Sequence, residues 1–173
     1  MTYFDLFEIP VQLKVDKGSL PHKYFELSKK YHPDYFANET MELQAEALER
    51  SALLNKALKT FQNSDETIKY ELQLKGRLQE DEKYELPPGF LMEILEINEA
   101  MMDREEAVRK DSFGGVSNIL PTIDKLQSEI YAPVKEIVEH YKDGITTNEE
   151  LLQVKEYYYK KKYIDRIRQQ LSA

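Results

Sequence analysis

The stretch LPHKYFELSKKYHPD, residues 20–34, decides the fold of the N-terminal half of this chain. Its apolar side chains recur at helical spacing and share one face: Leu20, Tyr24, Leu27 and Tyr31. Pro33 ends this helix, because proline restricts the residue before it and has no amide hydrogen to donate. The stretch therefore predicts an amphipathic helix that runs directly into a restricted turn displaying His32 and Asp34.

Further helices are predicted beyond this stretch. The next long helix carries its own apolar stripe: Leu43, Ala47, Leu54, Leu58 and Phe61. Short helices near residues 3–7 and around Ile68 and Leu72 are expected to cover the ends. Two long helices joined by a short loop pack antiparallel, so residues 1–76 predict a helical hairpin with short helices added.

A charged segment that begins at Gly76 and ends in Pro87-Pro88 predicts a linker at residues 77–88. Residues 89–173 are expected to form a three-helix bundle, which makes the fold class all-α. The first stripe is Phe90, Ile94, Ile97 and Met101, and Gly114-Gly115 follows it as a break. A second stripe runs from Ile119 to Tyr141 with a kink expected at Pro133, and the last helix places these residues inward: Val154, Tyr157, Ile164 and Leu171.

The composition excludes several function classes. Of 173 residues, 41% are hydrophobic and 32% charged, which fits a folded soluble chain, and the net charge of −8 disfavours general nucleic-acid binding. Without cysteine, the chain itself offers no thiol nucleophile, zinc–thiolate site or thiolate ligand for an iron–sulfur cluster.

Catalysis, membrane insertion and export are also not expected. The three histidines are scattered, and no phosphate-binding loop or nucleophile motif is present, so we expect no enzyme activity, cofactor or metal. No signal peptide or membrane-spanning apolar run is visible, so the expected location is cytoplasmic.

The candidate binding site is the His32-Pro33-Asp34 turn together with the helix before it. Lys23, Lys29 and Lys30 lie off the apolar stripe and give that helix a partly basic solvent face. A carboxylate held in a restricted turn is a good partner for an arginine of another protein, because the bidentate pair is strong and directional. Taken alone, however, the tripeptide also fits an ordinary surface turn.

The order of motifs resembles the J-domain. The motifs are Tyr3-Phe4-Asp5-Leu6-Phe7, then Lys29-Lys30-Tyr31, then His32-Pro33-Asp34, then Asn55-Lys56-Ala57. The resemblance implies that His32, Pro33 and Asp34 dock onto a DnaK-type ATPase and stimulate it. Lys23, Lys29 and Lys30 then supply electrostatic contacts. The chain departs from the common pattern at Tyr35, where a lysine often stands, and at Asn63-Ser64-Asp65, which lacks the usual proline.

A second candidate surface lies on the helix that starts near Phe90. Leu91, Leu95 and Met102 lie about 100° away from the core stripe, and Met92 lies further round. Acidic side chains stand beside them: Glu96, Glu99 and Asp103. An apolar patch that contains methionine and has an acidic rim suits a protein partner. The alternative is that Leu91 and Leu95 pack on a neighbouring helix or on the J-domain.

The layout and the segment Phe90-Leu91-Met92-Glu93-Ile94-Leu95-Glu96 resemble the HscB family of co-chaperones for iron–sulfur cluster assembly. The resemblance implies an HscA- or DnaK-type ATPase partner and a client of the IscU scaffold type. It places client contacts at Leu91, Met92, Leu95, Glu96, Glu99, Asp103 and an aromatic of the last helix, best matched by Tyr159, with Tyr157 and Tyr158 alongside. A general J-domain co-chaperone for another client and a non-catalytic helical adaptor are the alternatives.

The run Tyr157-Tyr158-Tyr159-Lys160-Lys161-Lys162-Tyr163 also permits a different interpretation. Mixed aromatic and basic side chains can form a platform for single-stranded nucleic acid. On a helix, the same run more often turns its aromatic rings inward while the lysine ends reach solvent. We favour the second interpretation and expect no nucleic-acid partner.

Overall fold

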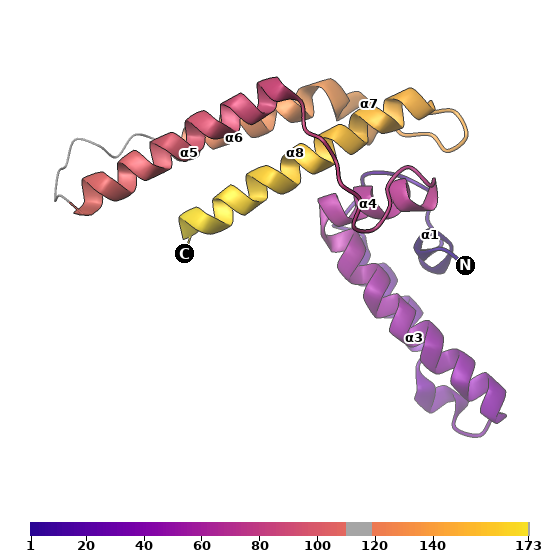
Figure 1. Cartoon of the computed structure of the whole chain (residues 1–173). Coiled ribbons are helices and arrows are strands. Elements are labelled where there is room, and N and C mark those ends of the chain that lie inside the picture. Colours follow the sequence, from indigo (N-terminus) through magenta and orange to yellow (C-terminus); the bar gives the residue numbers. More distant parts are fainter. Residues whose placement is uncertain (110–118, 173) are drawn as a thin grey trace. The chain divides into compact units, whose positions relative to one another are not determined.

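A computed structural model describes residues 1–109 and 119–172 of the chain. Within these ranges every regular element is a helix, which confirms the predicted all-α class. The chain divides into two compact units (Figure 1). Unit 1 comprises residues 1–78 and 138–147, and unit 2 comprises residues 79–137 and 148–173. No helix of the described residues has the length and apolar character needed to cross a membrane.

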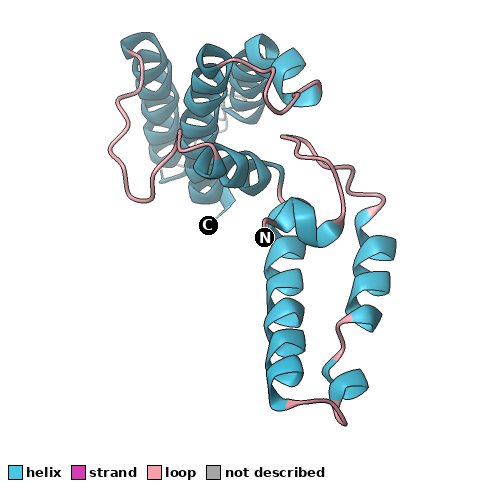
Figure 2. Cartoon of the chain, turned by 90° about the vertical axis from the view of Figure 1, so that its right-hand side faces the viewer, coloured by secondary structure: helices cyan, strands magenta, loops and turns pink. Residues whose placement is uncertain are grey.

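Unit 1 is built on a helical hairpin. Its elements are α1 (Tyr3–Phe7), α2 (Leu20–Lys30), the 3-10 helix η1 (Pro33–Phe36), α3 (Met41–Gln62) and α4 (Ser64–Leu74). Helices α2 and α3 pack side by side and antiparallel, and the loop between them contains η1 (Figure 2). This arrangement places the His-Pro-Asp turn at the end of the hairpin, as the sequence predicts.

The core of unit 1 joins α1 to the hairpin. The predicted stripe residues Leu20, Leu27 and Leu54 are buried, and Phe61 contacts Phe4 and Phe7 through their rings. Burying each such side chain contributes roughly 1.5–3 kcal/mol of hydrophobic free energy. Because α1 supplies two of these rings, the short N-terminal helix is an integral part of the hairpin.

The segment 138–147 belongs to unit 1 although it lies far along the chain. The Tyr141 hydroxyl donates a hydrogen bond to Glu71 Oε1 at 2.9 Å, and Lys75 pairs with Asp143. Glu71 is fully buried on α4, and its burial raises the pKa of the carboxyl. No sequence pattern indicated this addition to the predicted unit of residues 1–76.

Unit 2 contains three long helices. They are α5 (Pro88–Arg109), α6 (Ile119–Tyr131) and α8 (Asn148–Ser172), and the 3-10 turn η2 (Ala132–Val134) leads from α6 to α7 (Lys135–Glu139). Most of the predicted inward residues form the core: Phe90, Ile94, Ile97, Ile123, Leu126, Ile130, Val154, Tyr157 and Ile164. Met101 and Leu171 are only half-buried. Helix α6 packs on both α5 and α8, so unit 2 has the expected bundle.

The structure corrects one detail of the bundle. The sequence predicted a single kinked helix through Pro133, but the helix stops at Tyr131 and resumes as α7 after the 3-10 turn. Proline supplies no amide hydrogen and its ring collides with the preceding turn, so here the helix breaks instead of bending. Gly114-Gly115, the predicted break before α6, lies outside the described residues.

Candidate functional sites

The His-Pro-Asp turn is held by hydrogen bonds of its own backbone. His32 caps η1 with its imidazole, because Nδ1 accepts a hydrogen bond from the Asp34 amide at 3.2 Å. The His32 carbonyl accepts a second hydrogen bond from the Tyr35 amide at 3.1 Å. Together with the fixed φ of Pro33, these bonds restrict the direction in which the Asp34 side chain leaves the turn.

The Asp34 carboxylate remains available to a partner. Its side chain is 89% exposed, and its Oδ2 lies 3.5 Å from His32 Nδ1. That nitrogen accepts the Asp34 amide hydrogen, which assigns the imidazole proton to Nε2 in the neutral tautomer. In that tautomer Nδ1 has no hydrogen to donate, and the Asp34 side chain remains open to solvent.

Contacts between α2 and α3 fix the base of this turn. The Tyr24 hydroxyl donates to Asn55 Oδ1 at 2.6 Å, and the guanidinium of Arg50 lies over the ring of Tyr31 at 5.4 Å. The Gln44 side-chain amide donates to two carbonyls of the loop, those of residues 37 and 39. The turn is therefore attached to the hairpin from both sides.

The three predicted docking lysines have different surroundings. Lys23 Nζ lies 3.2 Å and Lys30 Nζ lies 3.7 Å from the carboxylate of Glu8, which follows α1. Lys29 instead places its ammonium over the ring of Phe25, 4.3 Å from the ring centre. All three lysines lie on α2, but only Lys29 has no ion pair with Glu8.

Helix α5 carries the second candidate surface on the side away from its core stripe. Leu91, Met92 and Leu95 are 43%, 64% and 56% exposed, whereas Ile94 and Ile97 are 3% and 5% exposed. The predicted acidic rim is exposed as well: Glu96, Glu99 and Asp103. Leu91 and Leu95 therefore lie outside the buried core of unit 2.

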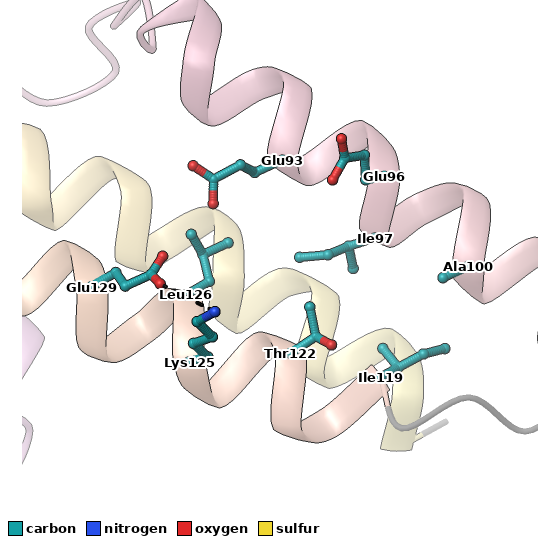
Figure 3. Close-up of a pocket in the computed structure, with 9 residues that line it drawn as sticks. All are labelled: Glu93, Glu96, Ile97, Ala100, Ile119, Thr122, Lys125, Leu126 and Glu129. Atoms are coloured by element: carbon teal, nitrogen blue, oxygen red, sulfur yellow. Dashed lines mark ion pairs between the residues drawn. The ribbon is translucent and has the colours of Figure 1, made fainter.

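The acidic rim continues into a groove between α5 and α6. Glu93 and Glu96 from α5 lie across from Lys125 and Glu129 of α6, over an apolar floor that includes Ile97 (Figure 3). Lys125 Nζ is 3.9 Å from Glu129 Oε1. Glu96 thus stands where the groove meets the apolar patch.

The aromatic run of α8 is mostly engaged within unit 2. Tyr157 and Tyr158 are buried, and Tyr159 is half-buried. The Tyr159 hydroxyl donates to Glu82 Oε1 at 2.8 Å, and its ring stacks on Tyr84 with centres 4.5 Å apart. The run therefore does not present a stack of free rings to a nucleic acid.

Sequence reasoning missed Glu82 and Tyr84, which lie in the predicted linker. Lys155 Nζ also pairs with Glu82, at 3.0 Å. These contacts join positions more than seventy residues apart, so no local spacing indicates them. The predicted linker is in fact attached to α8 along part of its length.

Metal binding has no candidate group in the described part of the chain. Residues 1–109 and 119–172 contain no set of three or more histidine, aspartate or glutamate side chains arranged to hold an ion.

Comparison with known proteins identifies the family. Residues 86–172, half of the chain, match the family model described as the HSCB C-terminal oligomerisation domain. The structure of human co-chaperone protein HscB is similar over 99% of this chain and 81% of the human chain, with 26% identity and a TM-score of 0.76. Chaperone HscB from Vibrio cholerae shares the fold over 99% of both chains, with 24% identity and a TM-score of 0.58. This chain therefore belongs to the HscB family of co-chaperones, which are not enzymes.

Proposed function

We propose that this protein stimulates ATP hydrolysis by an HscA- or DnaK-type chaperone and delivers an IscU-type scaffold protein to it during iron–sulfur cluster assembly. One observation carries the proposal: Asp34 is 89% exposed in a turn whose direction the backbone restricts. Such a carboxylate offers an arginine of the ATPase a bidentate partner with little loss of freedom on binding. Membership of the HscB family supports the same assignment.

The ATPase-docking surface consists of the turn and the basic side of α2. His32, Pro33 and Asp34 make the directional contact in this proposal. The ammonium groups of Lys23, Lys29 and Lys30 attract an acidic surface on the ATPase over a longer range. Charges of this kind raise the rate of encounter more than they raise the final affinity, so docking should weaken as salt is added.

The client surface is the exposed side of α5. Leu91, Met92 and Leu95 supply apolar area, and Met92 adapts its shape to the partner. Glu96, Glu99 and Asp103 form an acidic rim that favours a client with basic side chains around its own apolar contact. Tyr159 takes part only through the portion of its ring that Tyr84 leaves uncovered.

The ATPase assignment is tested by single-turnover and steady-state ATP hydrolysis with a purified HscA- or DnaK-type partner. Asp34→Asn preserves the size of the side chain and removes its charge, so stimulation should be lost while the melting temperature is unchanged. His32→Gln should behave in the same way. The matched control is Glu39→Gln, which removes a nearby exposed carboxylate and should stimulate like the wild type.

The same assay separates the proposal from its alternatives when IscU is added. A co-chaperone of the proposed kind stimulates the ATPase alone and stimulates it further with IscU. A general J-domain co-chaperone shows the first effect without the second, and a helical adaptor binds IscU with no stimulation at all. Full stimulation by Asp34→Asn would show that the turn is an ordinary surface feature.

A further inference from the structure

Glu8 occupies a backbone position that ordinarily suits glycine. It follows α1 with φ 55° and ψ 40°, in the left-handed region, and its amide donates to the carbonyls of Phe4 and Asp5 to close the helix. Side chains other than glycine and asparagine are disfavoured in this conformation, because the Cβ atom crowds the backbone. The reason for a glutamate at this position must therefore lie in the contacts of its side chain.

The side chain of Glu8 reaches across to α2. Its Oε2 accepts a hydrogen bond from Lys23 Nζ at 3.2 Å, and its Oε1 lies 3.7 Å from Lys30 Nζ. The two lysines are seven residues apart, about two helical turns, so they lie on the same side of α2. The hydrogen bond from Lys23 and the charges of both lysines lower the pKa of Glu8.

The carboxylate has no packing role that would explain its position. The Glu8 side chain is 52% exposed, and it forms ion pairs with Lys23 and Lys30. Lys29, the third lysine of the proposed docking surface, contacts the Phe25 ring instead. Glu8 thus acts on two of the three lysine charges that α2 presents to a partner.

We propose that Glu8 is an internal competitor for Lys23 and Lys30, which shields the basic face of α2 and limits how tightly an acidic partner surface docks there. The proposal rests on the ATPase-docking function given above and adds a residue that regulates it. Carboxylates of the partner must displace Glu8 before they can pair with the two lysines. The free chain therefore presents less positive charge at this surface than the lysines alone would supply.

The expected effect follows from the size of exposed ion pairs. Glu8→Gln adds one net positive charge within reach of the docking surface and leaves both lysines free. Exposed ion pairs are individually weak, so the partner should bind only about 1.4- to fivefold more tightly at low salt. The gain should shrink as salt rises, since the screening length is only about 8 Å at physiological ionic strength.

The experiment compares full-length variants in binding to the HscA- or DnaK-type ATPase by fluorescence anisotropy at low and high salt. Glu8→Gln removes the charge, and Glu8→Gly removes the charge and the backbone strain together. Both should tighten binding by the same factor, while thermal melting checks that unit 1 stays folded. The control Glu66→Gln makes the same change in net charge on an exposed residue of α4, and it should bind like the wild type.

Binding to the ATPase and binding to an acidic peptide together test whether Glu8 shields the two lysines. Binding by Glu8→Gln that equals the wild type, or is weaker, overturns the proposal, and weaker binding would show that Glu8 positions the lysines. A second probe does not depend on the ATPase: a short oligoglutamate peptide should bind Glu8→Gln more tightly than the wild type at low salt. If the wild type does not bind the ATPase but the peptide result holds, the docking function fails and the shielding by Glu8 stands. Equal peptide binding by both proteins overturns the shielding itself.

Discussion

Helices α5 and α8 both carry apolar side chains on more than one face, but the exposure of these side chains differs between the two helices. On α5 the core stripe is buried, and Leu91, Met92 and Leu95 remain 43–64% exposed. On α8 the neighbours Tyr157 and Tyr158 are both buried, although adjacent positions on a helix point about 100° apart. A wide apolar arc therefore does not by itself indicate a binding surface.

On α8, Tyr157 packs against Tyr131 of α6, and the neighbouring Tyr159 is covered by a segment of the predicted linker. Residues from the predicted linker lie on α8, where Glu82 pairs with Lys155 and Tyr159, and Tyr84 stacks on the Tyr159 ring. The exposed side of α5 has no such cover in the described structure, as the exposures of its leucines and Met92 show. Whether an apolar face of a helix stays exposed therefore depends on whether another segment packs on it, which is a property of the tertiary fold.

The largest expected effect separates the two faces of α5. Ile94→Ala with Ile97→Ala removes buried side chains, and each truncation should cost about 2–5 kcal/mol of unfolding free energy. The triple change of Leu91, Met92 and Leu95 to alanine acts on exposed positions, where changes are usually within about 0.5 kcal/mol each.

Urea unfolding and calorimetric titration with IscU should be measured on both variants. The triple variant should keep its stability and lose IscU binding along with the additional ATPase stimulation. A loss of stability comparable to that of the Ile94/Ile97 variant would mean that the apolar side of α5 is covered in solution, and the contrast with α8 would disappear.

A smaller effect is expected when the cover of α8 is removed. Tyr84→Ala deletes the stacked ring, and aromatic pairs contribute about 0.5–1.5 kcal/mol beyond the area they bury. Tyr84→Phe keeps the ring and is the matched control, which should melt close to the wild type. The fluorescence of the tyrosines and the melting temperature report the change. Equal stability of the two variants would indicate that the stack does not hold the segment.

Tyr159→Phe tests the hydrogen bond in the same cluster. It keeps the ring and removes the hydroxyl that donates to Glu82, so about 1 kcal/mol of stability should be lost. Tyr163→Phe is the control on the same helix, because the Tyr163 hydroxyl makes no hydrogen bond within residues 1–109 and 119–172. Chemical denaturation measures both. If the Tyr159 ring contacts the client, IscU binding should survive this change, whereas Tyr159→Ala should weaken it.

The smallest expected effect is on the pH dependence of the folding stability, through Glu82. Burial raises the pKa of Glu82, but hydrogen bonds from Tyr159 and Lys155 outweigh burial and leave the pKa below the ordinary 4.5. A lowered pKa means that Glu82 contributes stability above pH 4.5 and loses it as the pH falls through the folded-state value. The stability difference between wild type and Glu82→Gln should therefore narrow in acid.

Glu71→Gln is a control for which the pH dependence of the stability difference should have the opposite sign. Burial raises the pKa of Glu71, so the wild type loses stability relative to this variant as the pH rises above 4.5. Unfolding curves measured from acid to neutral pH should show the two differences changing in opposite directions. Parallel changes would contradict the assigned environments of the two carboxyls.

Much of the fold could be predicted because helices are specified by nearby residues. The apolar spacing of Leu20 and Leu27 on α2, and of Ile94 and Ile97 on α5, follows the helical repeat, and all four residues are buried. Pro33 ends α2 as expected, because its effect acts on its immediate neighbours. Pro133 was predicted to bend a helix and instead divides it, since the response to an internal proline depends on the surrounding packing.

The sequence by itself determined the helical class, the His32-Pro33-Asp34 turn and the excess apolar side chains of α5 and α8, all of which depend on residues within a few turns of each other. Only the tertiary structure decided that Glu8 meets Lys23 and Lys30, and that Tyr159 is partly covered while Leu95 is exposed. These outcomes depend on contacts between segments distant in the chain. Helical spacing shows which face a side chain occupies, but the segment that packs on that face is selected by the folding of the whole unit.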